Sequence, residues 1–413
     1  MASKLFENVR FRQPKMSAFD LSHERKMSGA MGQLYPTLVQ EIVPGDEFKV
    51  NSEIMMRMAP MIAPVMHRVD VYMHYFFVPN RIIWNQWEDF ITGGKDGTTT
   101  PTMPTLALTD AERTNGSLAD HMGIPTAGDG GGGPANPVVN ALPFRGYLEI
   151  LNEYFRDENL QDAIDVETAL QSQLTTLRTR AWEKDYFTSA LPFAQRGPAV
   201  NLPLGEDAPI ISNPDNPLQG QFTQNTDESP SDPDSSLRKD NVGNIYDALT
   251  GKTQHINPNN SWVADLANAT ATTINELRKA SALQRWLERQ ARGGYRYIET
   301  ILSHFGIRSS DARLQRPEYL GGNKQPITIS EVLNTTGTVE APQGSMAGHG
   351  ISVGQSNHFK KRFEEHGYVF AIMSVLPRTA YQQGIQRHWT RRDKEDFYWP
   401  EFANLGEQEI KTS

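Results

Sequence analysis

Residues 46–58, DEFKVNSEIMMRM, and residues 69–78, VDVYMHYFFV, decide the fold class of this 413-residue chain. In the first stretch apolar and polar side chains alternate almost throughout, which is the pattern of a β-strand with one buried face. The second stretch is rich in β-branched and aromatic residues and ends at Pro79, so it predicts another strand. Both stretches indicate a β-rich core.

Two further segments extend this core to both ends of the chain. Residues 37–43, TLVQEIV, predict a strand just before the first stretch. Residues 368–376, YVFAIMSVL, are apolar at successive positions and are bounded by a glycine and a proline, as expected for a strand covered on both faces. The core must therefore pair residues near 50 with residues near 370, which predicts a β-sandwich with elaborated loops.

Helices are expected between the strands, without the regular strand-helix alternation of a doubly wound fold. Asn80 is positioned to cap a helix over residues 81–92, and residues 144–156 have a similar apolar period. The clearest helix covers residues 274–292, where Thr273 and a glutamate three residues later form a capping box.

Two long segments, about 93–143 and 193–271, have no regular pattern. Structureless segments of this length inside a compact domain are usually functional or mobile. The second segment is acidic: seven carboxylates lie between Glu206 and Asp234, and no basic residue lies between Arg196 and Arg238. We expect one domain over 36–413 with these two insertions, of which the second is the candidate for a surface protrusion.

Residues 1–35 form a basic arm, although the whole chain has a net charge of -9. The arm carries six Lys or Arg against three acidic residues, a local charge of +3. Such a segment favours contact with a polyanion, so we expect the arm to face nucleic acid, and the alternative that it does not stays open. Its basic residues are Lys4, Arg10, Arg12, Lys15, Arg25 and Lys26.

The segment RHWTRRDKEDFYWPEF at 387–402 mixes arginine with large aromatic residues. This chemistry can stack single-stranded bases, but it also dominates protein-protein contacts. We favour a subunit interface over nucleic-acid binding. The candidate interface residues are Arg387, Trp389, Arg391, Arg392, Tyr398 and Trp399.

No pattern points to catalysis. The chain has no cysteine, which excludes thiolate metal sites and cysteine nucleophiles. No HxH pair supports a cupin metal site, no GxSxG elbow is present, and the glycine run at 130–133 lacks the Gly-Lys-Ser/Thr ending of a phosphate loop. We therefore expect no enzyme, no cofactor and no metal, and the lack of a long apolar run predicts no membrane span.

Several blocks of the sequence resemble the F-type major capsid proteins of the Microviridae, and the gokushovirus branch is nearest. The clearest are FDLSH at 19–23, VPGDEF at 43–48, FFVPNRIIWNQWEDF at 76–90, RPEYLGG at 316–322 and DFYWPEFANLGEQ at 396–408. The matching blocks keep their order and span nearly the whole chain.

The resemblance implies an eight-stranded antiparallel jelly roll with long inserted loops and a few helices. It further implies a homo-oligomer that forms pentamers and a sixty-copy T=1 shell around circular single-stranded DNA. Minor virion or scaffolding proteins would be partners, the insertion at 193–271 could meet a host receptor, and the virion would assemble in the bacterial cytoplasm. A carbohydrate-binding jelly-roll module is the alternative from another class, and a cupin-type enzyme is third.

Overall fold

The computed structural model describes residues 17–402 with gaps, and the chain divides into two compact units. The first unit comprises Met1–Pro192, Arg308–Asn404 and Gln408–Ser413; the second comprises Phe193–Ile307 and Leu405–Glu407. Within 201–272 the description is confined to six short strands. The gaps are residues 95–97, 128–135, 194, 201–272 outside those strands, 294–296, 309, 312–314, 336–341, 356–357 and 381–384.

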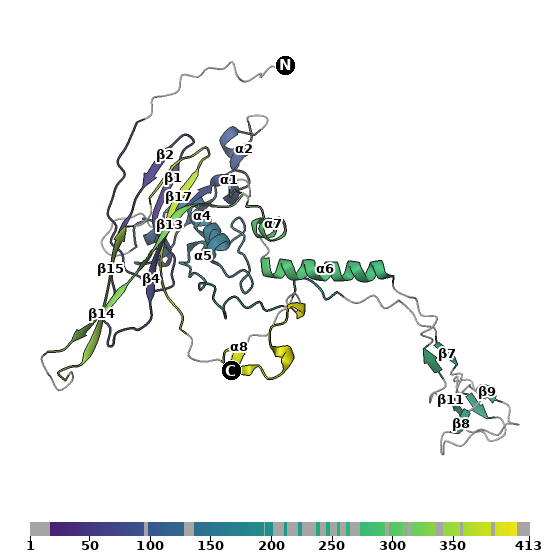
Figure 1. The fold of residues 1–413 in the computed structure, drawn as a ribbon. Coiled ribbons are helices and arrows are strands. Elements are labelled where there is room, and N and C mark those ends of the chain that lie inside the picture. Colours follow the sequence, from purple (N-terminus) through teal and green to yellow (C-terminus); the bar gives the residue numbers. More distant parts are fainter. Residues whose placement is uncertain are drawn as a thin grey trace. The chain divides into compact units, whose positions relative to one another are not determined.

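A four-stranded antiparallel sheet forms the centre of the first unit, in the order β1-β17-β4-β13 (Figure 1). It joins the two ends of the chain, because β17 lies between β1 and β4 and pairs Phe370 with Phe76. The strands predicted over 37–43, 69–78 and 368–376 are therefore confirmed. Their bounds are β1 Tyr35–Ile42, β4 Val69–Pro79, β13 Glu318–Pro326 and β17 Gly367–Pro377.

Five further strands, four of them short, cover one face of this sheet. The expectation of a single strand over 46–58 was wrong, because β2 pairs with β16 whereas β3 pairs with β15. The break falls at Asn51 and Ser52, and the Ser52 hydroxyl accepts a 2.7 Å hydrogen bond from Tyr75 in the central sheet. The bounds are β2 Glu47–Val50, β3 Glu53–Arg57, β14 Thr328–Leu333, β15 Met346–Gln355 and β16 Phe359–Arg362.

Alternate side chains of β4 supply two separate cores. Met73, Tyr75 and Phe77 pack toward the short strands, whereas Phe76 and Val78 pack toward a helical layer on the other face. Side chains of a strand alternate between the faces of a sheet, so a strand buried on both faces must be apolar at successive positions. This arrangement explains the continuous apolar runs in β4 and β17.

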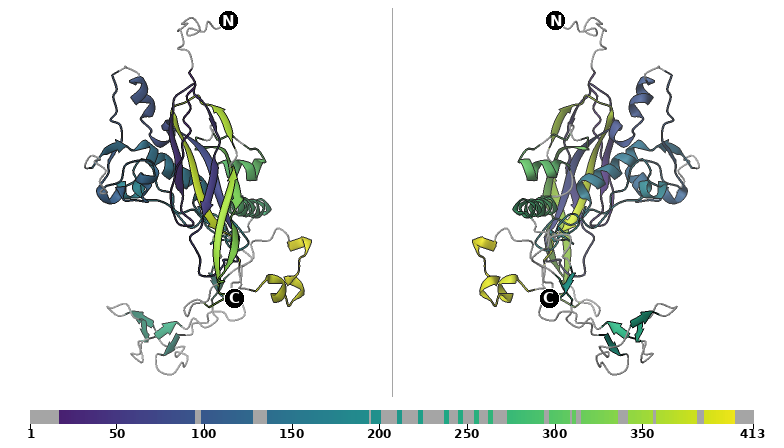
Figure 2. Two further views of the ribbon diagram at one scale, coloured as in Figure 1. Left: turned by 90° about the vertical axis from the view of Figure 1, so that its left-hand side faces the viewer. Right: turned by 90° about the vertical axis from the view of Figure 1, so that its right-hand side faces the viewer.

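The helical layer lies on one side of the strands (Figure 2). The helix predicted over 81–92 is two short helices, and Asn80 is the buried first residue of α1 rather than its cap. The second of them ends at Gly93, which has a φ of 81°, as expected. The helices are α1 Asn80–Ile83, α2 Trp87–Thr92, α4 Leu142–Ile150, π-helix η2 Leu151–Phe155 and α5 Gln171–Thr175.

The segment 93–143 contains regular elements and buried side chains, whereas its sequence suggested a segment without regular structure. Leu106, Leu108 and Leu118 are fully or nearly buried in the same core as α4. Three buried leucines hold this segment against the sheet through the hydrophobic effect rather than through long regular elements. Its elements are β5 Thr105–Ala107, η1 Asp110–Arg113, α3 Leu118–His121 and β6 Val138–Asn140.

The described part of the second unit contains three two-stranded antiparallel pairs and two helices. The capping box predicted at α6 is confirmed, since Thr273 N–H donates to Glu276 at 2.9 Å and Glu276 N–H donates to the Thr273 hydroxyl at 3.3 Å. The elements are β7 Ile210–Ser212, β8 Phe222–Gln224, β9 Leu237–Lys239, β10 Ile245–Asp247, β11 Gln254–Ile256, β12 Trp262–Ala264, α6 Ile274–Gly293 and α7 Tyr297–Phe305.

The described part of the chain is thus mostly antiparallel sheet with few helices, which is consistent with the predicted β-sandwich. None of the helices described here is long and apolar enough to cross a membrane.

Candidate assembly surfaces

The C-terminal segment leaves the central sheet after β17 and displays its aromatic side chains to solvent. Trp389 and Tyr398 are 75% and 73% exposed, and Trp399 is also exposed. Arg392 is exposed, while the Arg391 guanidinium lies 5.5 Å from the centre of the Phe397 ring. The segment contains α8 Arg387–Thr390, η3 Lys394–Asp396 and η4 Pro400–Phe402; the side chain of Arg387 lies outside the described part.

Local hydrogen bonds give this segment a defined shape despite its exposure. Trp399 donates its indole N–H to the Lys394 carbonyl at 2.7 Å, and the Asp396 carboxylate accepts from the Arg392 and Asp393 amides at 2.9 and 3.2 Å. Aromatic rings held in place and exposed are the side chains that anchor protein interfaces, because little entropy is lost when a partner covers them. Their contact with another subunit stays a prediction.

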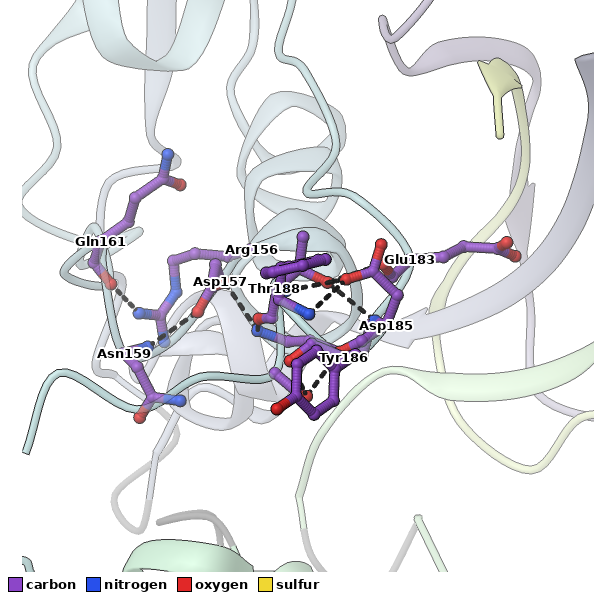
Figure 3. Close-up of polar contacts among 11 residues, drawn as sticks. Arg156, Asp157, Asn159, Gln161, Glu183, Asp185, Tyr186 and Thr188 are labelled. Carbon is purple, nitrogen blue, oxygen red and sulfur yellow. Dashed lines mark hydrogen bonds and ion pairs between the residues drawn. The ribbon is translucent and has the colours of Figure 1, made fainter. Parts of the chain in front are cut away.

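The base of the segment is anchored to a polar loop of the same unit, and Figure 3 shows the contacts within that loop. Thr379, just after β17, donates to the Asp185 carboxylate at 2.9 Å. The other carboxylate oxygen of Asp185 accepts from Thr188 N–H at 2.8 Å, and Lys184 forms a 2.6 Å ion pair with Asp157. These contacts fix where the exposed segment departs from the sheet.

The basic arm is partly described. Lys4, Arg10, Arg12 and Lys15 lie outside the described residues, so their contact with nucleic acid stays a prediction. The Arg25 guanidinium donates to four backbone carbonyls, those of residues 36 and 37 at the start of β1 and those of residues 120 and 121 in α3. Burial lowers the pKa of Arg25, and the Asp120 carboxylate opposes that shift.

Arg25 therefore acts as a clamp between the arm and the body of the subunit. Lys26 is exposed and lines a cavity of about 390 Å³ together with Arg25, Asp120 and His121. A guanidinium that already donates to four carbonyls has few donors left for phosphate. Of the two described basic residues, Lys26 is the one available to a polyanion.

Sequence analysis missed a charged network on the helical face of the central sheet. Asp70 in β4 is 1% exposed, and it pairs with Arg68 Nε at 3.0 Å and Lys324 Nζ at 3.1 Å. Lys324 also approaches Glu183 at 3.4 Å, and Glu183 accepts a 2.6 Å hydrogen bond from the Tyr72 hydroxyl. A buried carboxylate requires such partners, since leaving it unpaired would cost several kcal/mol.

His74, four residues beyond Asp70 in β4, is kept neutral in this environment. Its Nδ1 lies 3.1 Å from the Tyr319 hydroxyl, and burial, followed by the charge of Arg180, lowers the pKa of His74 to about 4. Arg180 stacks 4.5 Å from the centre of the Tyr72 ring and donates to Ser374 at 3.1 Å. The network joins β4, β13 and β17 to the segment around residue 180, so it is a structural element of the subunit.

A cavity of about 460 Å³ beside α4 is lined by four acidic residues, Glu149, Glu153, Asp165 and Glu167. Burial, followed by the charge of Glu153, raises the pKa of Glu149 to about 7. Within the described residues, no three His, Asp or Glu side chains gather closely enough to hold a metal ion.

Comparison with known proteins assigns the chain that carries these surfaces to a protein family. A family model described as "Capsid protein (F protein)" matches residues 8–413. The chain belongs to this phage F capsid protein family. Its relatives include capsid protein VP1 of Bdellovibrio phage phiMH2K, which is 38% identical over 95% of this chain and 75% of the relative.

Two further relatives of this F capsid protein are similar over nearly its whole length. Capsid protein VP1 of Chlamydia phage 1 is 33% identical over 98% of this chain and 78% of the relative. Capsid protein VP1 of Spiroplasma virus 4 is 33% identical over 96% of this chain and 75% of the relative. The phages that these relatives come from are gokushoviruses of the Microviridae, so the predicted family is confirmed.

The F capsid protein is thus a structural major capsid protein and not an enzyme, and it is a component of the virion. This assignment favours the capsid over the carbohydrate-binding module. Self-assembly into a shell requires that each subunit expose apolar and aromatic surface before assembly and bury it afterwards. The C-terminal segment has the chemistry of such a surface.

Proposed function

We propose that this F capsid protein is the repeating subunit of a T=1 icosahedral shell of sixty copies that encloses a circular single-stranded DNA genome and assembles in the cytoplasm of a bacterial host. The observation that carries the proposal is the family match over residues 8–413. The exposed aromatic and arginine side chains at 389–399 support it, because a monomer gains nothing from displaying them.

The proposed fold is the eight-stranded jelly roll. The central sheet of four strands supports this, as do the strands that face it across the apolar layer of Met73, Tyr75 and Phe77. The described residues form four strands in the central sheet and five opposite it, of which β2 and β3 are separated only by Asn51 and Ser52.

The basic arm is proposed to face the genome. Inside a shell, lysine and arginine neutralise phosphates without reading sequence, so basic residues that lie near the genome are sufficient. Replacing Arg10, Arg12 and Lys15 by alanine should reduce the DNA content of particles while subunit folding is unchanged. Particles of the triple variant with the normal DNA content would refute this placement of the arm.

The acidic insertion at 193–271 is proposed to lie on the outer surface and to protrude from it, where it could meet a host receptor. Its seven carboxylates between Glu206 and Asp234 would be repelled by packaged DNA, so the outer side is electrostatically favoured. Minor virion or scaffolding proteins are proposed to assist assembly.

Mass photometry of the purified full-length protein tests the shell proposal. Pentamers of about 230 kDa, or closed particles, are expected from a 46.3 kDa chain that forms a closed symmetric assembly. A chain that stays monomeric even after co-expression with the other virion proteins of its phage would contradict the proposal.

A further inference from the structure

The long helix α6 of the second unit carries a stripe of arginines. Its 20 residues include five basic and two acidic side chains, in a chain whose net charge is -9. Successive arginines are 7, 4 and 3 residues apart. With 3.6 residues per turn they fall within about 60° of the helix surface and extend over about 21 Å. The members of this arginine stripe are Arg278, Arg285, Arg289 and Arg292, and all four are exposed.

The arginine stripe is not neutralised by the acidic residues of its own helix. None of the four arginines forms an ion pair within the part of the chain that the structure describes. Glu276 accepts a 2.9 Å hydrogen bond from Thr273 N–H, and Glu288 accepts one of 2.9 Å from the Gln284 amide. Guanidinium groups that lie side by side without anions repel one another, so a polyanion that covers them would stabilise the helix.

An aromatic side chain borders the arginine stripe. Trp286 lies one turn before Arg289 and is 47% exposed. On its other side Trp286 contacts α7, where its ring centre lies 5.9 Å from that of His304. The two helices approach closely (Figure 1), since a Cβ at Gly293 would lie 2.6 Å from the Ser303 side chain. A half-exposed indole that is supported by α7 and lies beside guanidinium groups can stack on a nucleic-acid base.

We infer that the arginine stripe and Trp286 bind the single-stranded DNA genome, with the guanidinium groups on phosphates and the indole against a base. Arginine can donate two parallel hydrogen bonds to a phosphate, and an aromatic ring stacks on any unpaired base, so this surface binds single strands without reading their sequence. The inference rests on the proposed enclosure of a single-stranded genome. It adds a second DNA-binding surface to the basic arm.

The position of α6 in the sequence is compatible with an acidic insertion on the outer surface. Asp234 is the last of the seven clustered carboxylates, and it precedes Ile274 at the start of α6 by 40 residues. The two oppositely charged segments can therefore face different environments.

Fluorescence anisotropy with the purified full-length subunit and a labelled oligothymidylate of about 16 nucleotides tests the stripe. Arg285→Ala with Arg289→Ala removes two phosphate contacts, and alanine preserves the helix. This stripe variant should bind about tenfold or more weakly, and its plot of log affinity against log salt should be shallower by about 1. The control variant, Arg57→Ala with Arg362→Ala, removes two exposed arginines from β3 and β16 and should bind within about twofold of the natural protein.

Two results of this measurement would overturn the inference. Equal affinities of the stripe variant and the control variant would mean that DNA binds elsewhere on the subunit, such as at the basic arm. Absence of salt-dependent binding in the natural subunit would mean that the stripe is not open to DNA, as expected if the acidic insertion covers it.

Trp286→Ala gives an independent readout. Loss of stacking should weaken binding by about fivefold or more without changing the salt dependence, because stacking releases no counterions, and Trp286→Phe should retain most of the affinity. An unchanged affinity of Trp286→Ala would refute the contact between the indole and a base. These measurements use the unassembled subunit, so a failure of the natural protein to form particles would contradict the shell proposal and not the DNA-binding surface.

Discussion

The hydroxyl of Tyr147 connects three separate segments of the subunit, and its removal should be costly. It donates to the Leu34 carbonyl at 2.9 Å and accepts from the Arg178 amide at 3.0 Å. Tyr147 is buried on α4, and burial raises the pKa of its hydroxyl well above the ordinary value, so it stays protonated. Tyr147→Phe keeps the ring in the core but leaves one carbonyl and one amide without a partner.

The expected loss of stability follows from the Leu34 carbonyl and the Arg178 amide that lose their partner. A buried polar group that loses its partner costs about 1–3 kcal/mol, so Tyr147→Phe should lower the free energy of unfolding by about 2–4 kcal/mol after relaxation. The exposed Tyr186 is the matched control, and Tyr186→Phe should change the free energy of unfolding by less than about 0.5 kcal/mol.

Urea unfolding of the unassembled subunit, followed by circular dichroism, measures both variants against the natural protein. The unfolding midpoint of Tyr147→Phe should be clearly lower, with the same slope. If the two variants have equal midpoints, the hydroxyl is not the link between α4 and the segments at 34 and 178.

Three other predictions concern charge. Folding lowers the pKa of His74 from 6.5 to about 4, so the unfolded chain binds more protons than the folded chain between these pH values. The free energy of unfolding should therefore fall by about 1–3 kcal/mol as the pH drops from 6.5 to 4. Denaturation of His74→Gln across this window should show a smaller fall. Glu149 should give the opposite pH dependence of stability, because its pKa of about 7 makes the folded chain bind more protons than the unfolded chain. The free energy of unfolding should fall as the pH rises from 4.5 to 7, and an unaltered pH profile in Glu149→Gln would refute this. Arg25→Ala should release the arm from its four carbonyls, and limited proteolysis should then cut residues 17–30 faster than in Lys26→Ala.

The long strands could be predicted from the sequence because their burial is visible in local patterns. β4 and β17 are apolar at successive positions since each has a core on both faces, and in β1 Val39 packs against one core while Leu38 and Ile42 pack in the other. The break between β2 and β3 was not predictable, because it arises from a change of partner strand. The strands β13 to β16 were also missed, because their glycines look like loop residues. Gly348 is an example: it is required by the close approach of the loop at Pro64.

The charged contacts of the surfaces were less accessible to sequence analysis. Arg25 looked like a phosphate ligand because it lies in a basic arm, but its partners include carbonyls nearly a hundred residues away. Asp70 gave a weak signal as a carboxylate inside an apolar strand, yet nothing local identified Lys324 as its partner. Trp389 and Tyr398 are exposed, and their predicted contact with another subunit stays a prediction.

Cryo-electron microscopy of particles formed by this F capsid protein tests the central claim most directly. The account predicts icosahedral T=1 particles with one subunit in each asymmetric unit and a protein mass of about 2.8 MDa, the mass of sixty 46.3 kDa chains. Particles of another symmetry, or shells in which this chain is a minor component, would contradict it.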